Sequence, residues 1–558
     1  MNRRSFINSG LAALSGTIGN AASPPVAVEG RRAVIASDPE PCARAGARAI
    51  AAGGNAMDAA AAACLASCMH EPQAVDIGGY VACAVVLEGK TGKVWSVDAN
   101  SAAPAKARPD MYAVLPKRPG VSALDENEYG CSVKNNANVD GATAVGVPGT
   151  LAGIGTLWQR WGKLKWAEIV APSQELLDRG FAVGAALAQA SAARSRVLSS
   201  MPPAAAHFMP GGKPLQPGQI WHRPGMDWTL RRLARAGWQD FYQGEIARRI
   251  AAYVESLGGI LTLADLENYT PLVAPAIEIS CGGSRVYGAP LANGGLSCLS
   301  GLLLCHEVAP PDPSDPMYWH LLAEVLKLAW RDRLRYFGDP AKSNIDWRRF
   351  VSADYAAARM APLKKDRLSV DRAAGLIGNS PGTIHISTAD AEGNLVAITI
   401  SHGSSFGSCV TVPGTGISLG HGMSRFDPHP GLPNSVGPGK RPLNNVCPTI
   451  LRQPARDVAF GLRGGRRIVS VVLSLALHLV QGKSISDAIA APRMHTEGYE
   501  PIQVTESTPV PLRGALEKIG HRINVVPALA GAANIAERGR NGIVRAAGSL
   551  FALEVGWR

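Results

Sequence analysis

The threonine in the segment 381–387, which reads PGTIHIS, is the residue best placed to do chemistry. Thr383 directly follows Gly382 and heads an apolar, strand-like run. If the chain were cut between these two residues, Thr383 would carry both a hydroxyl nucleophile and an α-amine able to act as its base. An α-amine, with a pKa of about 8, suits that task at neutral pH. The segment therefore predicts a chain that cleaves itself and then attacks an amide.

A second hydroxyl and a pair of glycines could complete such a site. Ser401 follows 18 residues after Thr383 and could orient the new amine. Gly464 and Gly465 precede a helix-like run from Ile468, so their backbone N–H groups could stabilise an oxyanion. Taken singly, an ordinary strand threonine, a turn serine and a loop are the simpler interpretations. The occurrence of all three together, with the resemblance given below, favours the interpretation as a catalytic site.

Composition excludes several other classes of protein. The chain has 558 residues, of which 46% are hydrophobic and 18% charged, so a large buried core is expected. The net charge of +12 is dispersed without a dense basic block, which argues against nucleic-acid binding. The ten cysteines form no CxxC pair, so we expect no metal site. The chain has no run of 18 uninterrupted apolar residues, so we expect no membrane insertion.

The amino terminus has the pattern of a targeting segment. Residues 3–7 read RRSFI, a twin-arginine pattern, and a weakly apolar stretch and small residues follow. The pattern predicts a signal peptide over residues 1–22, cleaved near Ala22, and export of the folded protein to the periplasm by the twin-arginine route.

Hydrophobic patterning predicts strands on both sides of a helical middle. We expect strands at 33–36, 80–87 and 93–98, a helix interrupted at 53–55, mostly helices over 151–350, and a hairpin formed by 384–388 and 395–400. This order favours helices outside two packed sheets. The glycine-rich stretch 411–425 is the natural candidate for a lid.

The order of motifs resembles the γ-glutamyltranspeptidase family of N-terminal-nucleophile hydrolases, over nearly the whole length after the signal. The motifs that carry the resemblance are GGNAMDA at 53–59, APAKA at 103–107, VGVPGT at 145–150, FYQG at 241–244, GTIH at 382–385, GPGKRPL at 437–443, PTI at 448–450 and GG at 464–465.

The resemblance implies an α+β fold, a four-layer αββα sandwich, and a proenzyme. Cleavage would give a large subunit, 23–382, and a small subunit, 383–558, which stay associated as a heterodimer and form one composite domain. Thr383 would be the nucleophile, Ser401 would stand in place of a second threonine, and Gly464 and Gly465 would form the oxyanion hole. An acyl-enzyme would pass its acyl group to water or to an amine, with no metal or organic cofactor.

The chain departs from the family at the positions that grip the substrate. Asn100 replaces an arginine that holds the glutamyl α-carboxylate, and Arg425 replaces an aspartate that pairs with the α-ammonium. Gly403 replaces an asparagine, and Asn444 with Asn445 replace paired serines. Loss of an arginine–carboxylate pair should cost roughly 2–5 kcal/mol of binding, and Arg425 should repel an ammonium group. As an alternative, Arg466 or His421 could restore the clamp.

Three functions remain open from the sequence. The leading hypothesis is an exported amide hydrolase or acyltransferase whose small-molecule or peptide substrate has an anionic or neutral acyl group without a free α-amine, such as a dicarboxylate amide or a β-lactam side chain. The second is a true glutathione hydrolase or γ-glutamyltransferase with a rearranged clamp. The third is a non-catalytic binding homologue, against which the retention of Thr383, Ser401 and both glycines argues.

Overall fold

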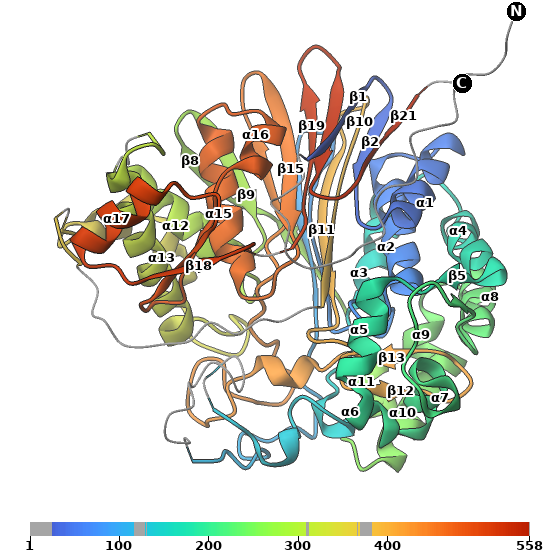
Figure 1. The fold of residues 1–558 in the computed structure, drawn as a ribbon. Helices are drawn as coiled ribbons and strands as arrows, with labels where there is room; N and C mark the ends of the chain where they lie inside the picture. Colours follow the sequence, from blue (N-terminus) through green and yellow to red (C-terminus); the bar gives the residue numbers. More distant parts are fainter. Residues whose placement is uncertain are drawn as a thin grey trace, which may run out of the picture.

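Two seven-stranded sheets pack face to face at the centre of the molecule (Figure 1). A computed structural model describes residues 25–116, 129, 131–308, 312–364, 366–368, 382–529 and 531–556. The first sheet, which carries Thr383, has the strand order β21 (Ala552–Val555), β2 (Ala33–Ala36), β10 (Thr383–Asp390), β11 (Leu395–Ser401), β3 (Val81–Leu87), β4 (Val94–Asn100) and β7 (Leu272–Pro275). The second sheet has the order β1 (Val26–Gly30), β20 (Val544–Gly548), β19 (Ala533–Gly539), β15 (Arg456–Leu462), β14 (Thr449–Arg452), β9 (Ser284–Gly288) and β8 (Ile277–Cys281).

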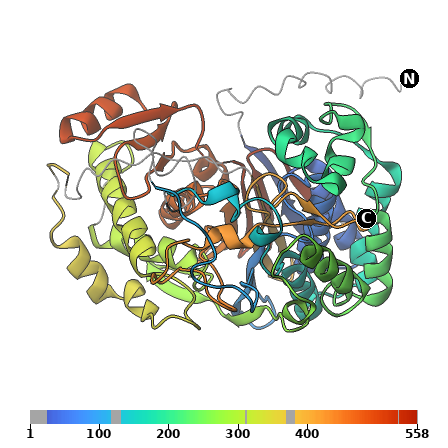
Figure 2. The same ribbon diagram turned by 90° about the horizontal axis from the view of Figure 1, so that it is seen from below.

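Helices cover the outer face of each sheet. Those against the first sheet are α1 (Glu40–Ala51), α2 (Ala56–His70) and α3 (Thr150–Trp161), with α4 (Trp166–Arg179) and α8 (Met226–Ala236) stacked outside them. Those on the side of the second sheet are α12 (Gly295–Val308), α15 (Arg467–Val480) and α16 (Ile485–Ala490), with α13 (Pro316–Tyr336), α14 (Ala353–Met360) and α17 (Val510–Ile519). Figure 2 shows the same two groups of helices on opposite sides of the strands.

The remaining helices, turns and strands complete the described chain. They are the helices α5 (Ala185–Ala193), α6 (Ser195–Ser199), α7 (Pro202–Phe208), α9 (Asp240–Gln243), α10 (Glu245–Ser256) and α11 (Leu263–Glu267), the 3-10 turns η1 (Lys134–Asn136), η2 (Ala142–Ala144), η3 (Pro210–Gly212), η4 (Trp347–Val351) and η5 (Gly422–Arg425), and the strands β5 (Phe181–Ala182), β6 (Ile220–Trp221), β12 (Val410–Thr411), β13 (Ser418–Leu419), β16 (Met494–His495), β17 (Ile502–Thr505) and β18 (Ile523–Val526).

Three apolar cores separate the four layers. One lies between the first sheet and its helices, one between the second sheet and its helices, and one between the two sheets. β10 and β11 are buried along their whole length, which explains why nearly every position in them is apolar or a small hydroxyl residue. The expected four-layer αββα sandwich is confirmed.

The predicted interruption of the first long helix is also confirmed. The side chain of Asn55 accepts hydrogen bonds from the backbone N–H groups of Met57 and Asp58, and Asp58 accepts one from the backbone of Asn55. This reciprocal capping starts α2 directly after the Gly53-Gly54 turn that ends α1.

The structure adds detail to two stretches of the predicted pattern. Residues 272–288 form the strands β7, β8 and β9, and Ile277, Ile279 and Cys281 alternate with exposed positions, a two-residue period that we overlooked in a helical region. The glycine-rich stretch 411–425, the candidate for a lid, includes most of the β12–β13 hairpin, whose strand residues are buried. The predicted signal segment 1–22 lies outside the described residues. Within the described part of the chain, none of the helices has the length and apolarity needed to cross a membrane.

Candidate functional site

Thr383 and Ser401 lie directly opposite each other at one end of the β10–β11 hairpin. Thr383 is the first residue of β10, Ser401 is the last of β11, and the antiparallel register pairs them. Their side-chain oxygens are 3.1 Å apart, and both residues are buried. The hairpin register therefore brings together the two hydroxyls that the sequence singled out.

The carbonyl of Gly382 belongs to the same hydrogen-bonded group. Ser401 Oγ donates to the Gly382 carbonyl oxygen and accepts from the backbone N–H of Gly403 at 3.0 Å. Because a serine hydroxyl has one proton, which Ser401 gives to the carbonyl, the hydroxyl of Thr383 must be the donor in its contact with Ser401. The oxygens of Thr383, Ser401 and Gly382 thus form a continuous chain of hydrogen bonds.

Residue 382 must be glycine because the backbone passes very close to a neighbouring turn. A Cβ atom built on Gly382 would lie 2.7 Å from the carbonyl oxygen of Gly403. The φ angle of Gly382 is +156°, a value that side chains rarely adopt.

A row of polar side chains continues from Thr383 between the two sheets. His385 contacts Thr399 Oγ1 at 2.8 Å and Ser387 Oγ at 3.1 Å, and Ser387 donates to the carbonyl oxygen of Asn534 at 3.0 Å. Burial lowers the pKa of His385 to about 3, so the imidazole is neutral. Farther along the row, burial raises the pKa of Asp38 to about 6, against the nearby positive charge of Arg463.

The two predicted oxyanion glycines lie at the start of helix α15, just beyond β15. The amino-terminal region of β10 lies against the end of β15, because a Cβ atom on Gly461 would meet the ring of His385 at 2.4 Å. Gly464 and Gly465 follow three and four residues later, and their carbonyls accept from Arg467 and Ile468 in the first turn of α15. The order of elements thus places these glycines three and four residues beyond the point where β15 meets His385 of β10.

The side chains of three predicted substrate residues form hydrogen bonds with other groups of the protein. The Asn100 side-chain amide donates to the Pro442 carbonyl at 2.5 Å, and that of Asn444 donates to Asn293 Oδ1 at 2.8 Å. Asn445 Oδ1 accepts from the Arg333 guanidinium at 3.1 Å. All three asparagines are buried and hold loops together.

His421 takes the space next to the glycine that replaces the family's asparagine. A Cβ atom on Gly403 would lie 2.3 Å from His421 Nε2, which accepts a hydrogen bond from the Ser404 backbone N–H at 2.6 Å. His421 Nδ1 therefore carries the proton and contacts Ser424 Oγ. Burial, aided by the charge of Arg425, holds the pKa of His421 well below its usual range. The sequence pointed to His421 only as an alternative clamp and missed this packing role.

Arg425 places a positive charge over the ring of Tyr80, a residue whose backbone contacts that of Ser401. Its guanidinium lies 5.3 Å from the centre of the Tyr80 ring, and the Tyr80 backbone N–H donates to the Ser401 carbonyl at 3.0 Å. The Arg425 backbone carbonyl accepts from Tyr129 and Asn434, which fixes the segment that carries it. Tyr80 was missed because nothing near it in the sequence marks a site. Arg466, the other alternative, forms an ion pair with Glu497 at 2.7 Å.

Known proteins share this architecture over most of the chain. The chain is 33% identical over 511 residues to the Acylase ACY 1 proenzyme of Pseudomonas sp. (strain SE83), covering 90% of this chain and 89% of the relative. It is 30% identical to the glutathione hydrolase proenzyme of Bacillus subtilis (strain 168), with 89% and 86% covered. The structure of cephalosporin acylase from Bacillus halodurans superposes with a TM-score of 0.84 at 27% identity, covering 99% of this chain and all of that one.

The family assignment follows from the extent of these matches. The sequence model of the family described as gamma-glutamyltranspeptidase matches residues 42–549. The chain therefore belongs to the gamma-glutamyltranspeptidase family and is an enzyme of the N-terminal-nucleophile amide hydrolase class.

Proposed function

We propose that this chain cleaves itself between Gly382 and Thr383 and that Thr383 then acts as the nucleophile of an amide hydrolase or acyltransferase. The observation that carries the proposal is the hydrogen-bonded chain formed by the Thr383 hydroxyl, the Ser401 hydroxyl and the Gly382 carbonyl. It joins a nucleophile to the carbonyl of the bond that must break.

The hydrogen-bond directions suit an attack on that carbonyl. As Thr383 Oγ bonds to the Gly382 carbonyl carbon, its proton can pass to Ser401 while Ser401 gives its own proton to the carbonyl oxygen. Collapse of the tetrahedral intermediate re-forms the carbonyl, whose proton passes to the leaving nitrogen as the C–N bond breaks. This leaves an ester on Thr383 with a free α-amine, and water then hydrolyses the ester to release the carboxylate of Gly382. Ser401 stabilises the developing charge, an effect typically worth 10²–10³ in rate, or about 3–4 kcal/mol.

The released α-amine would then serve as the base for Thr383. Ser401, no longer bonded to the Gly382 carbonyl, would be able to accept a hydrogen bond from that amine. In this proposal Gly464 and Gly465 supply N–H groups to the oxyanion of the substrate. The acyl group is transferred first to Thr383 and then to water or an amine. The subunits would comprise residues 23–382 and 383–558, and the twin-arginine pattern at residues 3–7 supports export to the periplasm.

The acyl group proposed for this enzyme carries a carboxylate and no α-ammonium. The buried Arg425 beside Tyr80 would attract an anion and repel a cation, while neutral His421 contributes no charge. Asn100, which replaces the arginine of the family's clamp, is turned to Pro442. The similarity to a cephalosporin acylase structure supports dicarboxylate amides, including β-lactam side chains, as candidates.

A true glutathione hydrolase or γ-glutamyltransferase is the second candidate. It is favoured by the 30% identity to the glutathione hydrolase proenzymes of Bacillus subtilis and Escherichia coli. The two candidates share the mechanism above and differ in the acyl group.

Intact-mass spectrometry of the purified protein tests the cleavage. We expect the wild type to give two chains, the smaller beginning at Thr383, and Thr383→Ala to remain uncut. Ser401→Ala should cleave about 10²–10³-fold more slowly. The matched control is Ser404→Ala, which removes a neighbouring buried hydroxyl for which the structure shows no hydrogen bond. An uncut wild type, or a Thr383→Ala protein cut at the same bond, would contradict the proposal.

A pair of substrates that differ by one amine tests the specificity. Glutaryl and γ-glutamyl anilides share the leaving group and the chain length, and only the second has an α-ammonium. We expect the larger kcat/KM for the glutaryl anilide. A larger value for the γ-glutamyl anilide would establish the second candidate.

A further inference from the structure

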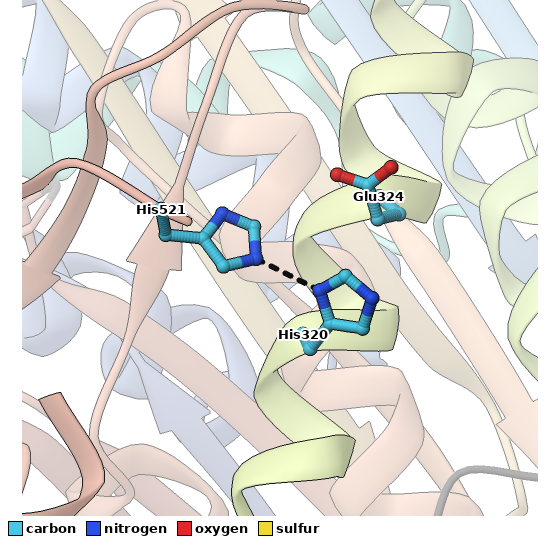
Figure 3. Close-up of side chains that lie close together, drawn as sticks. All are labelled: His320, Glu324 and His521. Carbon is cyan, nitrogen blue, oxygen red and sulfur yellow. Dashed lines mark hydrogen bonds between the residues drawn. The ribbon is translucent and has the colours of Figure 1, made fainter. Parts of the chain in front are cut away.

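A buried cluster of five ionisable side chains lies outside the candidate site, between helix α13 and the segment 494–526. Figure 3 shows three of its members, His320 and Glu324 on α13 and His521 just before β18. His320 Nδ1 and His521 Nε2 are 2.9 Å apart. Lys327 and Glu500 complete the cluster, and all five side chains are buried.

The hydrogen bonds fix how many protons the two histidines hold. His320 Nε2 contacts the Lys364 carbonyl at 2.8 Å, and a carbonyl only accepts, so Nε2 carries a proton. His521 Nδ1 contacts Glu500 Oε1 at 2.8 Å. Burial alone would raise the pKa of Glu500, but the hydrogen bond from His521 and the charge of Lys327 lower it to about 2. Glu500 is therefore an ionised acceptor, and His521 Nδ1 also carries a proton.

The two remaining nitrogens face each other and need a third proton between them. Without it, the lone pairs of His320 Nδ1 and His521 Nε2 would meet at 2.9 Å. Two neutral imidazoles carry one N–H each, so three N–H groups mean that the pair holds one positive charge.

The charges of the cluster balance only with that extra proton. Lys327 Nζ lies 2.7 Å from Glu324 Oε1 and 2.6 Å from Glu500 Oε1. Two carboxylates and one ammonium leave one negative charge, which the protonated histidine pair cancels. Burying an unbalanced charge costs several kcal/mol, so the neutral arrangement is the stable one.

A zinc ion is the other cation that these side chains could hold. His320, His521 and Glu324 offer ligand atoms within 4.8 Å of one another, and a carbonyl and a carboxylate orient the histidines as in many zinc sites. However, the Lys327 ammonium already binds Glu324, and a divalent ion would leave the cluster with one excess positive charge. The 2.9 Å separation is also that of a hydrogen bond.

We infer that the His320–His521 pair is a proton-binding site that couples the packing of the 494–526 segment on helix α13 to pH. The inference is independent of the proposed cleavage. If the cleavage occurs, the cluster joins the two subunits, because α13 lies before Gly382 and the 494–526 segment after it.

Other charged groups on the packed elements do not replace this proton. The Arg522 backbone N–H donates to Glu500 Oε2 and its guanidinium to the Glu500 carbonyl. Arg331 on α13 donates to the Gly498 carbonyl. Glu517 and Lys518 on α17, and the Lys364 side chain, are exposed.

The pair should make its largest contribution to stability near pH 6.5. The folded pair holds one proton, whereas two unfolded histidines, with pKa values of about 6.5, hold two at pH 5 and almost none at pH 8. Above pH 6.5 the folded state binds the additional proton, so stability falls as pH rises. Below pH 6.5 the unfolded state binds the additional proton, so stability falls as pH decreases. Each limb approaches a tenfold change in the folding constant per pH unit.

Two variants separate these limbs. In His320→Gln the amide can accept from His521 and donate to the Lys364 carbonyl, so His521 keeps its proton: we expect loss of the acid limb only. In His521→Leu the side chain offers no acceptor to His320 Nδ1, so the extra proton has no site, and we expect loss of the alkaline limb with a lower stability at pH 6.5. His478→Gln, which removes a buried histidine outside the cluster, is the control and should leave the alkaline limb unchanged.

Urea unfolding of the full-length protein from pH 5 to 8.5 measures these limbs as differences from the wild type. Opposite losses in the two variants support the inference, and His320→Gln alone tests it if His521→Leu does not fold. Identical profiles for His320→Gln and the wild type would overturn it. Zinc that remains bound at one equivalent after dialysis against a chelator, and is absent from His320→Gln, would also overturn it and assign a metal site instead.

Discussion

The paired hydroxyls and the residues around them are held in place by different kinds of structure. Thr383 and Ser401 are fixed by the register of two adjacent strands deep in a sheet. Asn100 ends the strand β4, and Gly403, Arg425, Asn444 and Asn445 belong to loops and turns. By the resemblance to the family, Thr383 keeps the family's residue and Ser401 keeps a hydroxyl in place of a threonine, whereas each of the five other positions is expected to carry a different kind of residue. The comparison suggests a division of roles for the proposed function, in which the sheet register holds the reacting hydroxyls and the surrounding loops set what is bound.

The largest effect should come from disturbing the strand end itself. Gly382→Ala places a methyl group 2.7 Å from the Gly403 carbonyl, so the bond to be cut must shift. We expect cleavage to slow at least about 100-fold, since small misplacements of reacting groups cost that much. Electrophoresis of samples taken over time measures it. Gly514→Ala, at a glycine with open space around its Cβ, is the control; equal rates for the two variants would show that this close approach does not matter.

Changing the charge that lies over Tyr80 should alter substrate choice without affecting cleavage. In Arg425→Asp the new carboxylate attracts an α-ammonium and repels a glutaryl carboxylate. We expect the ratio of kcat/KM values for γ-glutamyl and glutaryl anilides to rise about 10–100-fold, which corresponds to roughly 1.4–3 kcal/mol. Arg425→Met removes the charge without inverting it and should give an intermediate ratio. An unchanged ratio would place the acyl group away from Arg425.

Replacing Asp38, in the polar row that begins at Thr383, should increase the stability of the protein. Burial raises the pKa of Asp38 to about 6, so the folded state binds more protons than the unfolded state between pH 4 and 6, and stability is lost as pH rises through that range. Asp38→Asn removes this loss. We expect the free energy of unfolding to increase by about 2–3 kcal/mol at pH 7 and to be unchanged near pH 3.5, as measured in urea. An equal change at both pH values would attribute the effect to packing.

The smallest effect should come from returning a loop position to the family's residue. Asn444→Ser leaves the buried Oδ1 of Asn293 without its donor, so we expect a loss of about 1–2 kcal/mol in unfolding free energy and little change in substrate preference. Asn524→Ser, at an exposed position in β18, is the control. A gain of γ-glutamyl activity in Asn444→Ser would show that this loop selects the acyl group.

The sequence predicted the fold and the hydroxyl pair because both depend on local patterns. The hairpin of β10 and β11 is marked by two apolar runs and a turn, and that turn sets the register that pairs Thr383 with Ser401. The helix break at 53–55 is marked by a capping asparagine. Strands β7 to β9 were missed because their short alternation lies among helices.

The surroundings of the site could not be predicted because they depend on contacts between distant segments. Asn100 binds Pro442, 342 positions away, and Arg425 lies over Tyr80. The packing of His421 against Gly403 requires the hairpin between them to fold back, which no local pattern indicates. The His320–His521 pair is separated by 201 positions and belongs to no motif.

The bond from Ser401 to the Gly382 carbonyl has a consequence for how preparations of this protein behave. Under the proposed mechanism, that carbonyl occupies the place that a substrate carbonyl must take, so each molecule is its own first and obligatory substrate. The concentration of working sites then equals the concentration of molecules that have completed the cleavage. Specific activity would rise with the age of a fresh sample, follow first-order kinetics at any dilution, and record the history of the preparation.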